Sequence, residues 1–314
     1  MWLLNTHTAE LRFFTGPEDV SGGYVILSHV WGNASDEDTF QQLRMHSELH
    51  THWDVPRHYV SEKIRRFLSV AEDYGYHWAW ADTCCIDKTS SAELTEAINS
   101  MFRYYQLADL CFVYLHDVTF SRRTRDLSTR INGSRWHKRG WTLQELIAPK
   151  MVVFMSAEWR RIGTKYELAR NLQIATGIPE SVLRLEADVT DVSIAARMAW
   201  ASGRETTRVE DEAYCLFGLF GVNLPPLYGE GRNAFYRLQE EIMRTSVDVS
   251  LVAWGRGEAV GDLTNIVKIA NGWSEGLRAY NYLLAPSVKC FMDHNSTRYH
   301  PHSRHQVSVF QIYP

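Results

Sequence analysis

The stretch "GYVILSHVWG", residues 23–32, decides the fold that this sequence predicts. It opens with an apolar, β-branched run and ends in polar residues and a glycine, which is the pattern of a buried strand that leads into a loop. Three further apolar runs of similar length follow along the chain. The four predicted strands are residues 24–28, 77–82, 110–115 and 151–155.

Helix signals fill the intervals between these strands. Residues 56–75 begin with Pro and end with Gly, and apolar side chains recur there at helical spacing. Residues 90–108 begin with Ser90, and Glu93 three positions later gives the start of a capping box. A third helix is predicted within "HKRGWTLQELIAP" (137–149). This alternation of strand and helix predicts an α/β fold, an open parallel sheet with helices on both faces.

The pattern changes to helices without clear strands from about residue 160. The predicted helices are residues 166–178, 193–202, 209–221 and the later part of 225–244. We therefore expect an α/β core over residues 1–178 and a helical part over residues 179–247. Residues 248–314 give only weak strand signals, such as "HQVSVFQIYP", and are expected to be a weakly structured extension or the start of a further region.

Composition indicates a soluble globular protein. The chain has 314 residues, of which 45% are hydrophobic and 22% charged, and its net charge of −4 offers no basic footprint for nucleic acid. No apolar run approaches the roughly 20 residues that span a bilayer, and the N-terminus does not resemble a signal peptide. Five cysteines without a framework spacing favour reduced thiols, so we expect a cytoplasmic location.

The segment 137–149 places a carboxylate beside an indole. On a helix, Trp141 and Glu145 lie at i and i+4, opposite the apolar side chains of Leu143 and Leu146, on the face that should meet water. A carboxylate next to an aromatic plane suits cleavage of an N-glycosidic bond, because the anion stabilises an oxocarbenium-like ribose. The alternative is a surface glutamate of an amphipathic helix, with Trp141 covering a neighbouring loop.

Polar side chains follow the first predicted strand directly. In "SHVWG", Ser28 and His29 could bind a ribose or a phosphate, Trp31 could flank a ring, and Gly32 would allow close backbone approach. The alternative is a turn at the strand end in which His29 and Trp31 simply pack. Ligands of parallel sheets bind beyond the carboxyl ends of the strands, and this position favours a binding role.

"DTCCIDK" (82–88) follows the second strand. Asp82 could hold ribose hydroxyls, although an aspartate there could equally cap the next helix. A cysteine nucleophile at Cys84 or Cys85 with His29 as its base is a less favoured reading, because buried cysteines are usually inert. The charged segment 204–214 is predicted to be a structural ion-pair cluster. No histidine spacing fits zinc, so no metal site is expected.

Several stretches together resemble the heterokaryon incompatibility (HET) domain of filamentous fungi. They occur in the family's order over about residues 1–245, and the resemblance implies a role in self/non-self recognition that ends in programmed cell death. The matching stretches are "LLNTHTAEL", "YVILSHVWG", "WADTCCIDKTSSAELTEAINSMFRYY", "SRWHKRGWTLQELIAP", "WRRIGTK" and "RMAWASGRETTRVEDEAYCLFGLFGVNLPPLYGEGRNAFYRLQEEI".

The HET domain is in turn remotely similar to Toll/interleukin receptor (TIR) domains. That similarity implies a flavodoxin-like parallel sheet followed, in this chain, by an α-helical extension. Many TIR domains hydrolyse NAD with the glutamate of a W-C-x-x-E-L motif, which Trp141, Glu145 and Leu146 fill, with Thr142 in place of the cysteine. The resemblance thus implies Glu145 as the catalytic residue. In the hydrolase interpretation, which joins this resemblance to the positions of polar residues after the strands, the expected substrate-binding residues are Ser28, His29, Trp31, Gly32, Asp82, Arg139 and Trp141.

Two functional hypotheses follow from this resemblance. In the first, the protein is a cell-death effector and NAD glycohydrolase (NADase) that cleaves NAD or a related nucleotide at the nicotinamide–ribose bond; NAD is then a substrate, and no cofactor is expected. In the second, it is a non-enzymatic module that signals death by homotypic assembly. Both hypotheses imply a homo-oligomer when active, and an upstream NLR-type or other signalling partner is expected.

Overall fold

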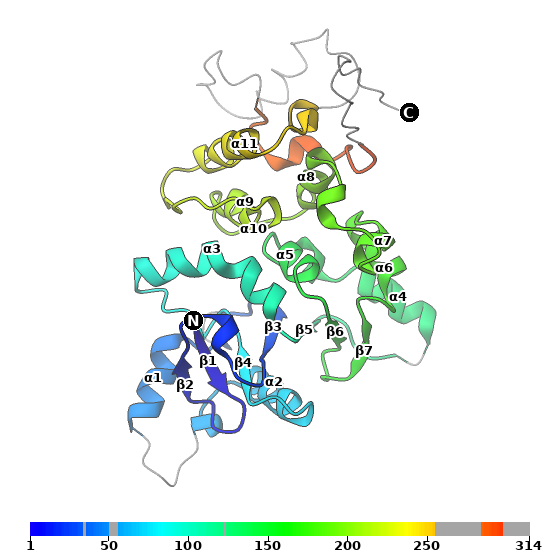
Figure 1. Cartoon of the computed structure of the whole chain (residues 1–314). Coiled ribbons are helices and arrows are strands. Elements are labelled where there is room, and N and C mark those ends of the chain that lie inside the picture. The colour runs from blue at the N-terminus through cyan, green and yellow to red at the C-terminus, as the bar shows by residue number, and fades with distance from the viewer. Residues whose placement is uncertain (34–35, 50–55, 122, 255–283, 298–314) are drawn as a thin grey trace.

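The computed structural model describes residues 1–33, 36–49, 56–121, 123–254 and 284–297. Within them, seven strands form one mixed sheet in the order β2-β1-β4-β3-β5-β6-β7 (Figure 1). The strands are β1 Trp2–Asn5, β2 Leu11–Phe13, β3 Val25–His29, β4 Trp78–Trp80, β5 Leu110–Tyr114, β6 Val152–Met155 and β7 Arg161–Thr164.

The centre of the sheet confirms the predicted parallel arrangement. β3 pairs in parallel with β4 on one side and with β5 on the other, and β5 pairs in parallel with β6. Numbered along the chain, these four strands lie in the order 2-1-3-4, which is the flavodoxin-like order. The order reverses beside β3, and the crevice at such a switch point is where open α/β sheets bind ligands.

The antiparallel edges of the sheet were not expected from the sequence. β1 pairs with β2 and β4, and β7 pairs with β6, all in antiparallel fashion. The β1–β2 turn has no glycine; instead, Asn5 Oδ1 accepts hydrogen bonds from the backbone N–H groups of His7 and Thr8, both at 2.9 Å. The two strands have only three or four residues each, and a side chain rather than a glycine forms the turn between them. The sequence pattern of such a hairpin is too short to recognise.

The helices of the α/β core are α1 Phe40–Leu49, α2 Glu62–Asp73, α3 Ser91–Leu107, α4 Thr124–Asn132 and α5 Thr142–Ile147, with the 3₁₀ helix η4 Arg135–Lys138 before α5. The predicted cap of α3 is confirmed, because the Ser90 side chain accepts from the Glu93 N–H. α2 buries an apolar stripe and contacts β4. α5 contacts both β3 and α3, which brings the predicted functional helix to the first strand.

The helical part follows the sheet as predicted. α6 Ala169–Thr176 still lies within the predicted core range 1–178, and the helical part contains α7 Glu180–Leu183, α8 Ile194–Ser202, α9 Asp211–Tyr214, α10 Phe217–Phe220 and α11 Asn233–Thr245. The single helix predicted over 209–221 is instead the two short helices α9 and α10. Figure 1 shows this part stacked on the side of the sheet that carries α3 and α5, and α10 packs directly on α3. The predicted strand "HQVSVFQIYP" lies outside the described residues.

Candidate functional site

Two carboxyl groups are bound at the carboxyl end of β3. The Ser28 hydroxyl, fully buried, donates to Glu145 Oε2 and accepts a hydrogen bond from Trp136 Nε1 at 2.8 Å. The next residue, His29, faces Asp82 with its Nε2 atom 3.1 Å from Asp82 Oδ1. Adjacent residues of one strand therefore hold a glutamate from α5 and an aspartate from the loop after β4.

The expectation that Glu145 lies on a water-facing helix side is wrong. α5 is buried on almost every side, and Glu145 is only 7% exposed. The helix is also short, since α5 covers only Thr142–Ile147 and the first two residues of the predicted segment, His137 and Lys138, belong to η4. The reason is tertiary: Glu145 faces the end of β3, where Ser28 binds its carboxyl, and α3 also contacts α5. A pattern within thirteen residues cannot show contacts with such distant segments.

The local environment makes Glu145 a weak acid. Burial and the nearby Asp82 charge raise the pKa of Glu145 to about 8, against the opposing effects of the Ser28 hydrogen bond and of Arg139 and Arg204. The carboxyl is therefore largely protonated at neutral pH in the free protein. A cation brought next to it favours its ionised form.

The pKa of Asp82 is shifted in the opposite direction. Burial opposes its ionisation, but the hydrogen bond and charge of His29, the charge of Lys88 and the hydrogen bond of Trp31 together lower the pKa of Asp82 to about 2. Trp31 Nε1 donates to Asp82 Oδ2 at 2.8 Å. Two neighbouring carboxyl groups whose pKa values are pushed apart in this way are the usual sign of divided acid–base or electrostatic roles.

The exposed border of the site is cationic. The Trp31 ring is 44% exposed, with Lys88 Nζ 4.1 Å and Arg139 Cζ 5.9 Å from its centroid. We call these three residues, Trp31, Lys88 and Arg139, the cationic rim. Of the predicted binding residues, Ser28 binds Glu145, whereas His29 and Trp31 bind Asp82. Asp82 and Arg139 lie close enough to Glu145 for their charges to shift its pKa.

Two predicted binding residues are occupied by other contacts. The Gly32 N–H donates to Glu37 Oε1 at 2.6 Å, so this amide is engaged within the protein. Trp141 is half-buried, and its side chain hydrogen-bonds with Asp211 of α9, whose Oδ1 also accepts from Tyr228 Oη at 2.9 Å. In this structure Trp141 therefore joins α5 to the helical part.

Arg204 is a site residue that the sequence pattern did not identify. The predicted ion-pair role for segment 204–214 is wrong for it, because among the described residues no carboxylate pairs with its guanidinium. Arg204 is 6% exposed and donates to Arg139 O at 3.0 Å, Thr142 Oγ1 at 2.9 Å and Trp200 O at 3.1 Å. It therefore fixes the turn that precedes Glu145.

The cysteine reading gains no support from the geometry. Cys84 and Cys85 are both buried. A hydrogen bond with Cys85, together with burial, raises the pKa of the Cys84 thiol well above its ordinary value, which disfavours the thiolate that a nucleophile requires. His29, the proposed base, is engaged with Asp82 instead.

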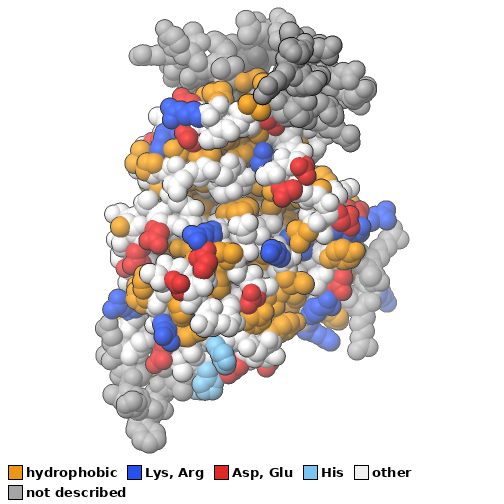
Figure 2. All heavy atoms as spheres, viewed as in Figure 1, with side chains coloured by type: hydrophobic (Ala, Val, Ile, Leu, Met, Phe, Trp, Pro, Cys, Tyr) orange, Lys and Arg blue, Asp and Glu red, His pale blue; other side chains and the backbone are white. Residues whose placement is uncertain are grey.

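The described part of the chain gives two further negative findings. None of its groups of His, Cys, Asp and Glu could hold a metal ion, and none of its helices is long and apolar enough to cross a membrane. On the face shown in Figure 2, basic and acidic side chains are interspersed among the described residues. An extended basic stripe of the kind that binds nucleic acid is not seen on that face.

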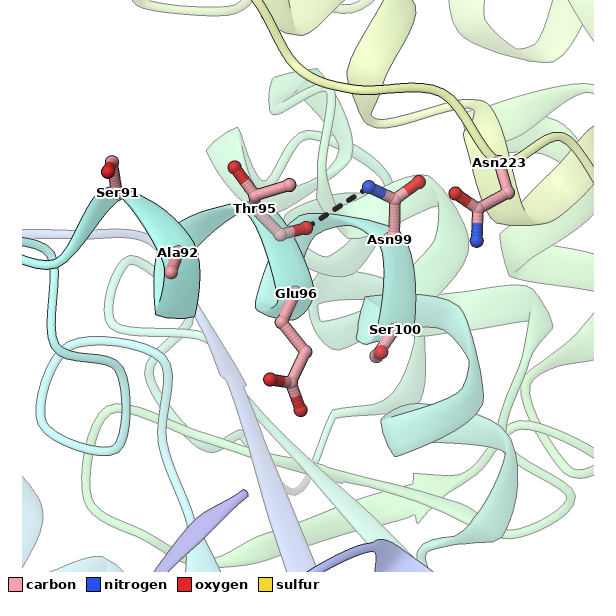
Figure 3. A pocket seen from close by; sticks show the side chains of 7 residues that line it. All are labelled: Ser91, Ala92, Thr95, Glu96, Asn99, Ser100 and Asn223. Atoms are coloured by element: carbon pink, nitrogen blue, oxygen red, sulfur yellow. Dashed lines mark hydrogen bonds between the residues drawn. The ribbon is translucent and has the colours of Figure 1, made fainter.

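A separate hollow of about 590 Å³ lies along α3 (Figure 3). Its lining residues are Ser91, Ala92, Thr95, Glu96, Asn99, Ser100 and Asn223. Asn99 is held inside the protein, since its Nδ2 donates to Thr95 O and Leu224 O, both at 3.1 Å. The lining offers neither an aromatic face nor a cation, so we place the candidate site at Glu145 and Asp82.

Fold and site together define a flavodoxin-like α/β domain with a carboxyl pair at its switch point. A family model for the heterokaryon incompatibility protein (HET) matches residues 24–123, which include Ser28, Asp82 and Lys88 but end before Glu145. The chain is therefore a HET domain protein, as its sequence motifs predict. A second family model, a domain of unknown function (DUF8212), matches residues 233–313.

The comparison with curated proteins agrees with this family. Vegetative incompatibility protein HET-E-1 of Podospora anserina is 45% identical over 227 residues. The aligned region makes up 70% of this chain but only 16% of that protein, so the chain spans a small part of its relative's length. No solved structure gives a significant match.

Proposed function

We propose that this protein is an incompatibility-type cell-death effector that hydrolyses NAD or a related nucleotide at the nicotinamide–ribose bond. The incompatibility role is supported by the HET match and by the similarity to a vegetative incompatibility protein. The single observation that supports the chemistry is the carboxyl pair of Glu145 and Asp82, which adjacent residues of β3 hold at one strand end. Glu145 is the more buried of the two, and their pKa values are shifted in opposite directions. The remote resemblance to TIR domains assigns Glu145 the same chemistry.

The reaction needs a negative charge beside the ribose whose bond to nicotinamide breaks. The bond between the ribose C1′ and the pyridinium nitrogen breaks with both electrons going to nitrogen, which releases neutral nicotinamide and leaves positive charge on the ribose. Glu145, ionised by the approach of the cationic ring, stabilises that charge. Water then attacks C1′, and one of its protons passes to a carboxylate of the pair. Asp82, held by His29 and Trp31, supplies a second anion.

Activity should rise with pH in this mechanism. Because Glu145 acts as the anion and its pKa in the free protein is about 8, kcat/KM for NAD should increase from pH 6, reach half its maximum near pH 8 and level off about one pH unit higher. The measurement is nicotinamide release at low NAD concentration across pH 6 to 9. A profile that falls over this range would show that the protonated carboxyl is the active form and would contradict the role given to Glu145.

We also propose that activity requires homotypic assembly under the control of an upstream partner. The aligned region is only 16% of HET-E-1, so in that relative most of the protein lies outside the region shared with this chain. An NLR-type partner that brings several HET domains together would fit this arrangement. The purely non-enzymatic assembly module is the competing account, and the Glu145→Gln variant discussed below separates the two.

A further inference from the structure

The distribution of charge around the site is ordered from inside to outside. Glu145 and the Ser28 hydroxyl lie innermost, and Asp82 follows with its side chain 20% exposed. The cationic rim of Trp31, Lys88 and Arg139 lies outermost. Arg139 belongs to both zones, because it lies over Trp31 and its charge also acts on the Glu145 carboxyl.

The two rim cations are not neutralised by ion pairs. Among the described residues, neither Lys88 nor Arg139 has a carboxylate oxygen within 4 Å, whereas Lys63, Arg57 and Arg237 elsewhere are each paired. The Arg139 guanidinium makes one long contact, from Nη1 to Thr207 Oγ1 at 3.5 Å. The Trp31 ring, fixed by its bond to Asp82, keeps both cations at one place.

We propose that Lys88 and Arg139, held around Trp31 at the border of the carboxyl pair, form the subsite for the pyrophosphate of a dinucleotide substrate. This inference rests on the proposed function and specifies its substrate class. A nicotinamide dinucleotide carries a cationic ring at one end and two phosphate charges one ribose away. The site offers carboxyl groups inside and cations at the rim, in the same order.

Asp82 belongs to the inner half of this arrangement. The sequence left open whether Ser28 and His29 contact a ribose or a phosphate, but they lie beside Asp82, and an ionised aspartate repels phosphate. Its oxygens suit ribose hydroxyls or the cationic ring. We therefore assign phosphate binding to Lys88 and Arg139. The Arg139 guanidinium can contact two phosphate oxygens through parallel N–H donors.

The test is equilibrium binding of ADP-ribose, measured by calorimetry on the full chain. Lys88→Met and Arg139→Met should each weaken ADP-ribose binding about tenfold, the effect of removing a charge-assisted hydrogen bond. Lys150→Met is the matched control, because this exposed lysine precedes β6 and so lies at the opposite edge of the sheet. Adenosine, which lacks the pyrophosphate, should bind the parent protein more weakly and should not respond to either substitution.

Each outcome decides one of the two proposals. Parent-like ADP-ribose affinity in both rim variants, an equal loss in Lys150→Met, or no binding of ADP-ribose to the parent overturns the rim subsite. Rim-dependent binding of ADP-ribose without any release of nicotinamide from NAD supports the subsite and overturns the hydrolase. Release of nicotinamide from NAD, with ADP-ribose binding that does not depend on the rim, supports the hydrolase and overturns the subsite. Circular dichroism and melting temperature confirm that each variant is folded.

Discussion

Glu145→Gln is expected to reduce nicotinamide release from NAD by roughly two or more orders of magnitude, the scale of removing one electrostatic stabiliser. Glutamine retains the shape of the side chain and can still accept the hydrogen bond from Ser28, but it cannot become an anion. In cells the variant should be expressed normally and fail to kill. The measurement is turnover by purified protein alongside a killing assay at matched expression.

Stability provides an internal check on this variant. The pKa of Glu145 is raised from 4.5 to about 8 in the folded protein, so the carboxyl stabilises the fold fully below pH 4.5 and loses that contribution as pH rises through 8. The loss amounts to about 1.4 kcal/mol per pH unit between these values. Glu145→Gln has no such loss, so relative to the parent its stability should improve toward pH 8.

The control for Glu145→Gln is Glu240→Gln, the same substitution at an exposed position of α11. It should leave turnover, killing and the pH dependence of stability unchanged. A folded Glu145→Gln variant that kills as efficiently as the parent would exclude glutamate-dependent catalysis. The non-enzymatic assembly account would then be preferred.

Arg204→Met is expected to destabilise the protein by about 3 kcal/mol. The substitution removes the donors to Arg139 O, Thr142 Oγ1 and Trp200 O, and the contacts to the last two of these acceptors are buried. It also removes a positive charge that lowers the pKa of Glu145, so the pH profile of kcat/KM should move to higher pH. Chemical denaturation and the pH profile measure the two effects.

Arg197→Met separates the two effects of Arg204. Arg197 is also a buried arginine of the helical part, and it donates to Leu219 O at 3.1 Å, but it does not contribute to the pKa of Glu145. Its loss should reduce stability without moving the pH profile. Arg204→Lys keeps the charge and should restore the profile while only partly restoring stability. A parent-like profile in Arg204→Met would show that Arg204 is purely structural.

The parallel centre of the fold was predictable because its strands are continuous apolar runs. β3, β5 and β6 are each buried along almost their whole length, and the run in residues 23–32 gave the position of the first. The same strand pattern predicted that Ser28, Asp82 and Glu145 lie close together, because the carboxyl ends of parallel strands share one edge of the sheet. Strand and loop positions therefore carried most of the site prediction.

The environment of Glu145 was not predictable from local spacing. Its carboxyl is bound by Ser28, which lies 117 residues earlier in the chain. The turn before it is held by Arg204, whose guanidinium binds Thr142 across 62 residues. The indole N–H of Trp136 in η4 likewise donates to Ser28, which lies 108 residues away in the chain. Contacts at such separation leave no periodic signal in the sequence.

The most direct test of the central claim is nicotinamide release from NAD by the purified protein, both dilute and concentrated under crowding. The account predicts one nicotinamide and one ADP-ribose for each NAD consumed, with faster turnover in the concentrated sample and at least a hundredfold less from Glu145→Gln. Intact NAD after prolonged incubation with folded, concentrated parent protein would contradict it.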